Sequence, residues 1–212
     1  MLPFITRTAV CLALAIASAS ASAAGEAGLY GPVAPKGSTF VRVYNAGNAE
    51  VSASVGNTSL NEIAALGSSD FSFMPQGDYT AKLGSASLPV RLASDHYYTI
   101  VNNPAGAPLL VEETPFRNKQ KALLRVQNLS DQALSLKTAD GKTEVVPSVN
   151  PRGTGEREIN PVKVGLALYQ GERKVSDVKP VALERGEASV LYVTGQGNAL
   201  TPVWVARPAS AR

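Results

Sequence analysis

The chain contains an internal repeat, which constrains its fold because two copies of one sequence pattern form two copies of one structure. Phe40–Asn45 aligns with Leu123–Asn128, 83 residues later. Two further pairs of segments match at offsets of 91 and 94 residues: Leu88–Leu92 with Lys179–Leu183, and Pro108–Val111 with Pro202–Val205. The growing offset indicates an insertion in the second copy, and we expect it in a loop at Pro147–Pro161.

Short runs within the copies alternate apolar and polar residues, as in Val51–Val55, Tyr79–Leu83 and Val162–Leu168. A period of two places one set of side chains on one face of a half-buried strand. The chain has 18 glycines and 14 prolines among its 212 residues, which leaves little room for long helices between them. These patterns together predict short strands joined by turns.

The segment Ala122–Leu136 is ambiguous by itself, because its apolar residues also match helical spacing. The repeat resolves the ambiguity, since Asn128–Asp131 aligns with Asn45–Asn48, which has the composition of a turn. We therefore expect a strand, a turn and a second strand here.

Two copies of about 85 to 95 residues, each with about seven short strands, have the size of β-sandwich domains. The sequence predicts an all-β fold of two tandem β-sandwiches, immunoglobulin-like or similar to carbohydrate-binding modules. We place the N-terminal domain at residues 24–113 and the C-terminal domain at residues 114–212, because Pro115 and several charges interrupt the strand pattern there. One elongated sandwich that spans both copies is the alternative.

Residues 1–23 have the pattern of a secretory signal peptide. Arg7 precedes an apolar run, Ala9–Ala17, which is about half the length needed to span a bilayer, and small residues at Ala21 and Ala23 fit a peptidase site. Cleavage would remove Cys11, the only cysteine. We expect an exported protein without disulfides or a membrane span, which in a Gram-negative cell lies in the periplasm.

The composition argues against several classes of function. The net charge of +3 is too small for a charge-driven nucleic-acid binder. One cysteine and one histidine exclude zinc fingers and most metal-dependent hydrolases, and we expect no cofactor. A serine triad would need His96 with Ser68 or Ser69, but the Gly-x-Ser-x-Gly motif is absent.

Basic residues gather in two segments. Arg117, Lys119 and Lys121 follow the expected domain boundary, and Arg152 and Arg157 fall in the expected inserted loop. Basic side chains on loops can bind the carboxylates of a polyuronate or an acidic patch of a protein. Solvated surface charge is the alternative interpretation. Trp204, a candidate for stacking on a sugar ring, lies between two valines, a pattern that favours core packing.

Five blocks of the sequence closely resemble the AlgF family, the F component of bacterial alginate O-acetylation: Leu29–Ser38, Leu66–Phe71, Lys119–Ser130, Leu136–Thr143 and Arg157–Val164. The resemblance is continuous from residue 24 onward. It implies a Gram-negative periplasm and a role in acetylating mannuronate residues of the exported polymer.

The resemblance supplies no catalytic motif. It implies that partners perform acetylation: a membrane-bound O-acyltransferase and periplasmic SGNH-type O-acetyltransferases with a Ser-His-Asp triad. The leading hypothesis is therefore a non-catalytic adaptor between these partners, which raises their effective concentration. A carbohydrate-binding module that captures alginate directly is the alternative, and an acetyltransferase using Ser68 or Ser69 with His96 is a third.

Overall fold

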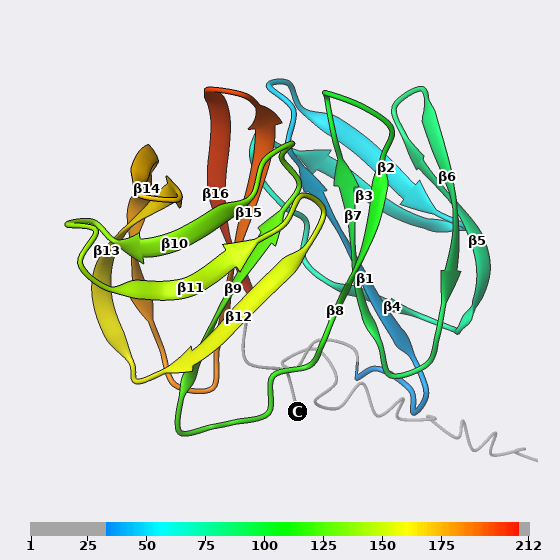
Figure 1. Ribbon diagram of the computed structural model, residues 1–212. Helices are drawn as coiled ribbons and strands as arrows, with labels where there is room; N and C mark the ends of the chain where they lie inside the picture. The colour runs from blue at the N-terminus through cyan, green and yellow to red at the C-terminus, as the bar shows by residue number, and fades with distance from the viewer. Residues whose placement is uncertain (1–32, 208–212) are drawn as a thin grey trace, which may run out of the picture. The chain divides into compact units, whose positions relative to one another are not determined.

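The computed structural model describes residues 33–207, and every regular element in that range is a β-strand (Figure 1). The chain divides into two units, residues 1–33 and 34–212, and all sixteen strands belong to the second. The predicted signal peptide, residues 1–23, lies outside the described residues. Within the described range there is no helix long and apolar enough to cross a membrane.

The N-terminal sandwich consists of two four-stranded sheets, in the orders β4-β1-β7-β8 and β3-β2-β5-β6. Its strands are β1 (Thr39–Asn45), β2 (Val51–Val55), β3 (Thr58–Ile63), β4 (Ser72–Met74), β5 (Gly77–Leu83), β6 (Ala86–Leu92), β7 (Tyr97–Asn102) and β8 (Leu109–Glu113). The pair β1 and β7 is parallel, and the other pairs are antiparallel.

The C-terminal sandwich has sheets in the orders β12-β9-β15-β16 and β11-β10-β13-β14. Its strands are β9 (Ala122–Asn128), β10 (Leu134–Thr138), β11 (Glu144–Val149), β12 (Thr154–Ile159), β13 (Val162–Gln170), β14 (Arg173–Leu183), β15 (Ala188–Gln196) and β16 (Ala199–Arg207). The strand order is the same in both sandwiches: β9 corresponds to β1, β10 to β2, and so on to β16 and β8. The parallel pair β9 and β15 corresponds to β1 and β7. The two predicted tandem sandwiches are confirmed.

Each sandwich has a hydrophobic core of its own between its two sheets. In β1, Val41 and Val43 enter the N-terminal core, and in β9, Leu124 and Val126 enter the C-terminal core. A single sandwich spanning both copies would need one continuous core, so the alternative architecture is wrong.

The strands β1 and β9 are buried on both faces. β9 is buried at every position, and β1 at every position except the half-buried Phe40. A third apolar cluster explains this pattern, because it contains residues of both sandwiches, including Tyr44 and Val101 from the first and Val190 and Tyr192 from the second. The outer faces of the sheets β4-β1-β7-β8 and β12-β9-β15-β16 therefore contact each other.

The turn after the first strand of each copy is held by a buried asparagine. The Asn45 side-chain amide donates to the carbonyls of Ala49, Ile63 and Ala64, at 2.7, 3.1 and 3.2 Å. Its counterpart Asn128 donates in the same way to three carbonyls: Gln132, Val149 and Asn150, at 2.8, 2.9 and 3.3 Å. The predicted strand, turn and strand in the second copy is confirmed, and the helical reading is wrong.

The segment Pro147–Pro161, expected to be an inserted loop, is mostly regular structure. It contains the end of β11 and all of β12, which pairs with β9 over six residues. The counterpart strand β4 pairs with β1 over three residues. The expectation was wrong because glycine, proline and charge in this segment belong to an edge strand and its flanking turns.

The register of the strands shows where the second copy is longer. Met74 at the end of β4 corresponds to Ile159, 85 residues later, and Leu92 at the end of β6 corresponds to Leu183, 91 residues later. Most of the extra length therefore lies in the hairpin β13–β14. Register shifts within this hairpin account for two of the additional residues, and the longer strands β13 and β14 account for the rest.

Candidate functional site

Three of the five predicted site residues lie together at one end of the C-terminal sandwich. Arg117 and Lys119 are exposed on the connection between the sandwiches, and neither side chain has a hydrogen bond or ion pair with the residues the structure describes. Lys121 is half-buried, and its Nζ lies 2.7 Å from Asn160 Oδ1 in the turn between β12 and β13. Arg117, Lys119 and Lys121 thus form one basic group.

A fourth basic residue joins this group and was missed in the sequence. Arg185 is exposed in the turn between β14 and β15, and its Nη1 lies 3.5 Å from Gln120 Oε1. The backbone N–H of Gly186 donates to the Lys121 carbonyl at 2.8 Å, which fixes this turn beside the connection. Arg185 is remote in sequence, so only the fold brings it here. We call Arg117, Lys119, Lys121 and Arg185 the basic end.

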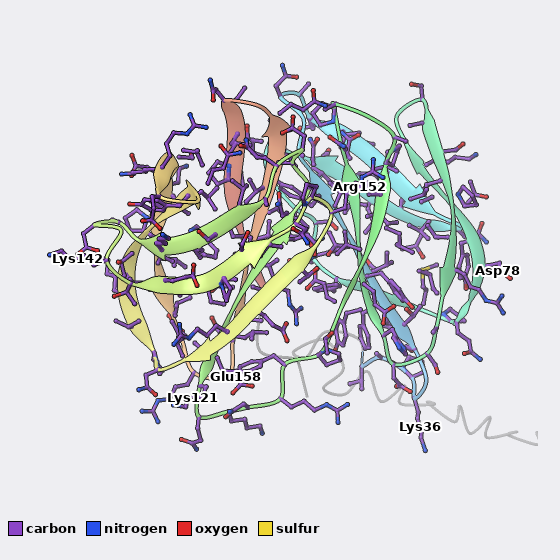
Figure 2. The ribbon with its side chains drawn as sticks, in the orientation of Figure 1. Lys36, Asp78, Lys121, Lys142, Arg152 and Glu158 are labelled. Atoms are coloured by element: carbon purple, nitrogen blue, oxygen red, sulfur yellow. The ribbon has the colours of Figure 1, made fainter. Side chains whose placement is uncertain are left out.

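Carboxylates and amides are interleaved with these cations. The Asn118 side-chain amide donates to Glu158 Oε2 at 2.7 Å, and Glu184 is exposed next to Arg185. Lys121 and Glu158 lie near each other in Figure 2, with Arg152 well away from both. The basic end is therefore a mixed surface with an excess of positive charge.

The remaining two predicted residues do not belong to this group. Arg152 is exposed in the turn before β12, at the opposite end of that strand from Glu158. Arg157 lies in β12 and its Nη1 donates to the carbonyls of Glu144 and Val145, at 3.0 and 3.2 Å. Arg157 thus ties the edge strand β12 to β11, a structural role.

Arg152 has an unusual backbone conformation, with φ of 61°. Leu66 has φ of 56° at the equivalent turn of the N-terminal sandwich, and each of the two residues is followed by a glycine whose carbonyl accepts a bond from the turn asparagine's N–H. A left-handed conformation is uncommon for residues other than glycine, asparagine and aspartate. The fold imposes this backbone on both copies and exposes a different side chain at each.

The two sandwiches carry opposite net charges. Residues 34–113 contain four lysines and arginines against seven aspartates and glutamates, a net charge of −3. Residues 114–207 contain 14 basic residues against nine acidic ones, a net charge of +5. The whole-chain charge of +3 conceals this division. A separate count for each predicted domain would have found it.

The connection between the sandwiches is held by equivalent arginines of the two copies. Arg42 Nη2 lies 2.7 Å from Glu113 Oε1, and both side chains are almost fully buried. Arg125, the counterpart of Arg42, donates from Nη2 to the Thr114 carbonyl at 3.1 Å and to Glu156 Oε2 at 2.7 Å. The two guanidinium groups therefore bind consecutive residues on either side of the predicted boundary.

The Glu113 carboxylate also receives bonds from both sandwiches. The Thr99 hydroxyl of β7 donates to Oε1, and the Tyr192 hydroxyl of β15 donates to the same oxygen at 3.1 Å. Arg42 lies over the ring of Phe71, 4.6 Å from its centroid. A buried ion pair needs such additional partners to offset its loss of hydration. The junction is therefore specified by polar contacts as well as apolar ones.

Tyr44 and Tyr192 meet at the centre of this junction, with ring centroids 4.8 Å apart. Burial raises the pKa of Tyr44 to about 12. Burial also raises the pKa of Tyr192, and the Glu113 carboxylate adds to the shift. The Tyr44 hydroxyl has no hydrogen-bond partner among the described residues, whereas the Tyr192 hydroxyl has one. Both phenols stay neutral at physiological pH.

The side chains required for a serine triad are not assembled. His96 Nδ1 lies 2.7 Å from the Ser94 carbonyl, and His96 Nε2 lies 3.5 Å from Glu112. The Ser69 hydroxyl donates to the Asp70 carbonyl and accepts from the Val43 N–H. His96 therefore contacts no serine hydroxyl, and within residues 33–207 no group of three or more His, Cys, Asp or Glu could hold a metal ion.

The fold and the site define a tandem β-sandwich protein with a fixed internal junction and a basic end. Residues 9–190 match the protein family described as "Alginate O-acetyl transferase AlgF". The chain belongs to the AlgF family, which confirms the family indicated by the sequence.

Relatives named AlgF agree with this assignment. The chain is 75% identical over 189 residues to the alginate biosynthesis protein AlgF of Pseudomonas syringae pv. tomato, a match that covers 89% of this chain and 85% of that protein. It is 67% identical to the solved C-terminal domain of AlgF from P. aeruginosa, with 42% of this chain and 100% of that chain covered and a TM-score of 0.39. For the solved N-terminal domain the identity is 62%, the coverage 39% and 100%, and the TM-score 0.36.

Proposed function

We propose that this chain is a non-catalytic adaptor required for the O-acetylation of alginate. It links a membrane-bound O-acyltransferase to periplasmic SGNH-type O-acetyltransferases, which place acetyl groups on the polymer. Membership of the AlgF family supports a role in alginate acetylation. The periplasm is the proposed compartment because residues 1–23 have the pattern of a signal peptide.

The surroundings of His96 are the main support for a role without catalysis. An acyl transfer through a serine needs a base within hydrogen-bond reach of the hydroxyl. The only imidazole of the chain contacts the Ser94 carbonyl and Glu112 instead. The family description contains the word transferase, but the described residues offer no assembled nucleophile and base.

The junction supports the adaptor hypothesis in a second way. Contacts of Arg42, Glu113 and Tyr192 tie the two sandwiches together across a short connection. A protein that binds two partners on surfaces of fixed relative geometry raises their effective concentration and also sets their orientation. We propose that the sandwiches present the acyltransferase and the acetyltransferase to each other in this way.

The first experiment tests for catalysis. The purified protein is incubated with polymannuronate and an activated acetyl ester, and acetyl transfer and ester hydrolysis are both measured. We expect no turnover above the uncatalysed rate, and His96→Ala in cells should leave alginate acetylation unchanged. Turnover by the wild type that His96→Ala abolishes would refute the proposal.

The second experiment tests the requirement for the protein. Deleting it from an alginate-producing cell should remove most acetyl groups from the secreted polymer, and supplying the chain again should restore them. Normal acetylation in the deletion strain would contradict a role in this reaction.

Direct capture of alginate is a second candidate, favoured by the exposure of Arg152 and Arg117. It requires a surface that binds carboxylates without help from a partner protein. Calorimetric titration with defined mannuronate oligomers separates the two candidates. Saturable binding that Arg152→Ala or Arg117→Ala weakens would favour capture, whereas the adaptor hypothesis predicts no binding.

A further inference from the structure

The opposite charges of the two sandwiches indicate that they suit different partners. The cores and turns of the copies are equivalent, but the net charge changes from −3 in residues 34–113 to +5 in residues 114–207. Charge complementarity steers association and excludes partners of like charge. A positively charged surface on the C-terminal sandwich therefore fits a partner whose facing surface is acidic.

The basic end brings four of the 14 basic residues of this sandwich together. Its four cations come from the connection and from the turn between β14 and β15, segments that are remote in sequence. Backbone and side-chain bonds join these segments, including Gly186 N–H to the Lys121 carbonyl and Lys121 Nζ to Asn160. Arg117, Lys119 and Arg185 are exposed. These bonds hold the two segments together, so the exposed cations lie on one surface of defined structure.

The surroundings of the cations favour a protein over a polyuronate as the ligand. Glu158 and Glu184 lie among them and would repel the closely spaced carboxylates of a polyuronate. Sugar-binding surfaces also present exposed aromatic rings, and the aromatic residues of this sandwich are buried or half-buried: Phe116, Tyr169, Tyr192 and Trp204. Trp204 Nε1 donates to the Lys179 carbonyl, and its ring packs against the core.

We propose that the basic end, Arg117, Lys119, Lys121 and Arg185, docks the acidic face of a protein partner in alginate acetylation. This inference rests on the adaptor function and adds to it a surface and a partner chemistry. The mixed charges and amides suit a protein surface, where ion pairs and hydrogen bonds alternate. The asparagine and glutamine side chains of the connection provide donors and acceptors beside the cations.

The test reverses charge at the basic end and at a matched site. One variant carries Lys119→Glu, Lys121→Glu and Arg185→Glu. The control carries Lys142→Glu, Arg173→Glu and Lys179→Glu, three exposed residues of the same sandwich with the same change of charge. Thermal unfolding checks that both remain folded. Because Lys119 makes no side-chain bond to the described residues, Lys119→Glu alone is the variant least able to disturb the fold.

The readouts are binding of the purified periplasmic acetyltransferase and acetyl content of alginate in cells. We expect the basic-end variant to weaken binding at least about tenfold and the control less than about threefold, and salt to weaken wild-type binding strongly. Lys119→Glu should produce an intermediate loss. Equal losses in the two triple variants would overturn the proposal, because they would reflect net charge alone.

Two further outcomes separate this inference from the adaptor function. If deletion of the protein abolishes acetylation but the basic-end variant supports it fully, the inference is wrong and the adaptor function stands. If deletion has no effect, the adaptor function itself is wrong. Saturable binding of mannuronate oligomers that the basic-end variant loses would assign the surface to the polymer and overturn a protein partner.

Discussion

The two sandwiches have the same strand order and turns, but they differ in how equivalent residues are used. Arg42 and Arg125 occupy matching positions on β1 and β9. Arg42 binds a carboxylate that is almost fully buried, whereas Arg125 binds Glu156, whose side chain is 50% exposed. The difference shows that one repeat position can pair with a buried carboxylate in one copy and with a half-exposed one in the other.

Exposed residues differ more between the two copies than the framework does, by which we mean the strands and the buried turn asparagines. The equivalent left-handed turns expose Leu66 in one copy and Arg152 in the other, and the net charges are opposite in sign. The turn asparagines, Asn45 and Asn128, keep the same set of carbonyl partners. The framework therefore preserves the fold while the exposed residues distinguish the two halves.

The largest difference in stability is expected between substitutions of the two equivalent arginines, Arg42 and Arg125. Arg42→Met leaves the Glu113 carboxylate buried without its cation, so it should lower the free energy of unfolding by about 3–5 kcal/mol. Arg125→Met leaves Glu156 in contact with water and should cost about 1–2 kcal/mol. Urea unfolding followed by circular dichroism measures both.

A rescue variant sharpens this comparison. Replacing Glu113 by Gln in the Arg42→Met background removes the unpaired charge and should recover part of the lost stability. Equal destabilisation by Arg42→Met and Arg125→Met would mean that burial of an ion pair does not determine how much the pair contributes to the stability of the fold.

The two turn asparagines should behave alike. Asn45→Ala and Asn128→Ala each leave three carbonyls without their side-chain donor, so each should lower the free energy of unfolding by about 2–3 kcal/mol. The exposed Asn57→Ala is the control and should change it by less than about 0.5 kcal/mol. A loss at only one of the two turns would show that the copies do not share this framework.

The smallest difference in stability is expected between substitutions of the two junction tyrosines, Tyr44 and Tyr192. Tyr192→Phe removes a bond to Glu113 and should cost about 1–2 kcal/mol, whereas Tyr44→Phe removes a hydroxyl with no partner among the described residues and should change stability by less than about 1 kcal/mol. Unfolding in urea at neutral pH measures both substitutions.

The pH dependence of stability tests Tyr44 further. Its pKa is raised to about 12 from an ordinary value of 10.0, so the unfolded chain loses this proton first as pH rises. The stabilising contribution is complete below about pH 10 and is lost as pH approaches 12. Tyr44→Phe should therefore reduce the decline in stability between pH 10 and pH 12. An unchanged decline would show that this phenol does not titrate as its burial implies.

The sequence predicted the parts of the fold that depend on local pattern. The alternation in Val51–Val55 and Tyr79–Leu83 corresponds to β2 and β5, and the repeat correctly identified the turn at Asn128. These features depend on side-chain periodicity and on the residue types that a turn requires. Both can be recognised from residues that are close together in the sequence.

The features that the sequence did not predict depend on contacts between remote residues. Arg42 and Glu113 are 71 residues apart, and nothing near either residue indicates that both are buried. Arg185 joins Lys121 only because the turn between β14 and β15 folds back beside the connection. Charged residues are ordinarily exposed, so a prediction from sequence places all of them on the surface.

The parallel pairing of β1 with β7 affects how the chain folds as it is synthesised. Phe40 pairs with Tyr97, and in the second copy Leu123 pairs with Ala188, so each first strand is synthesised about 60 residues before its parallel neighbour. Until then Tyr98 and Ile100 of β7 are missing from the core that Val41 and Val43 enter. We expect these segments to be the sites that a chaperone must cover while the chain emerges from its N-terminus.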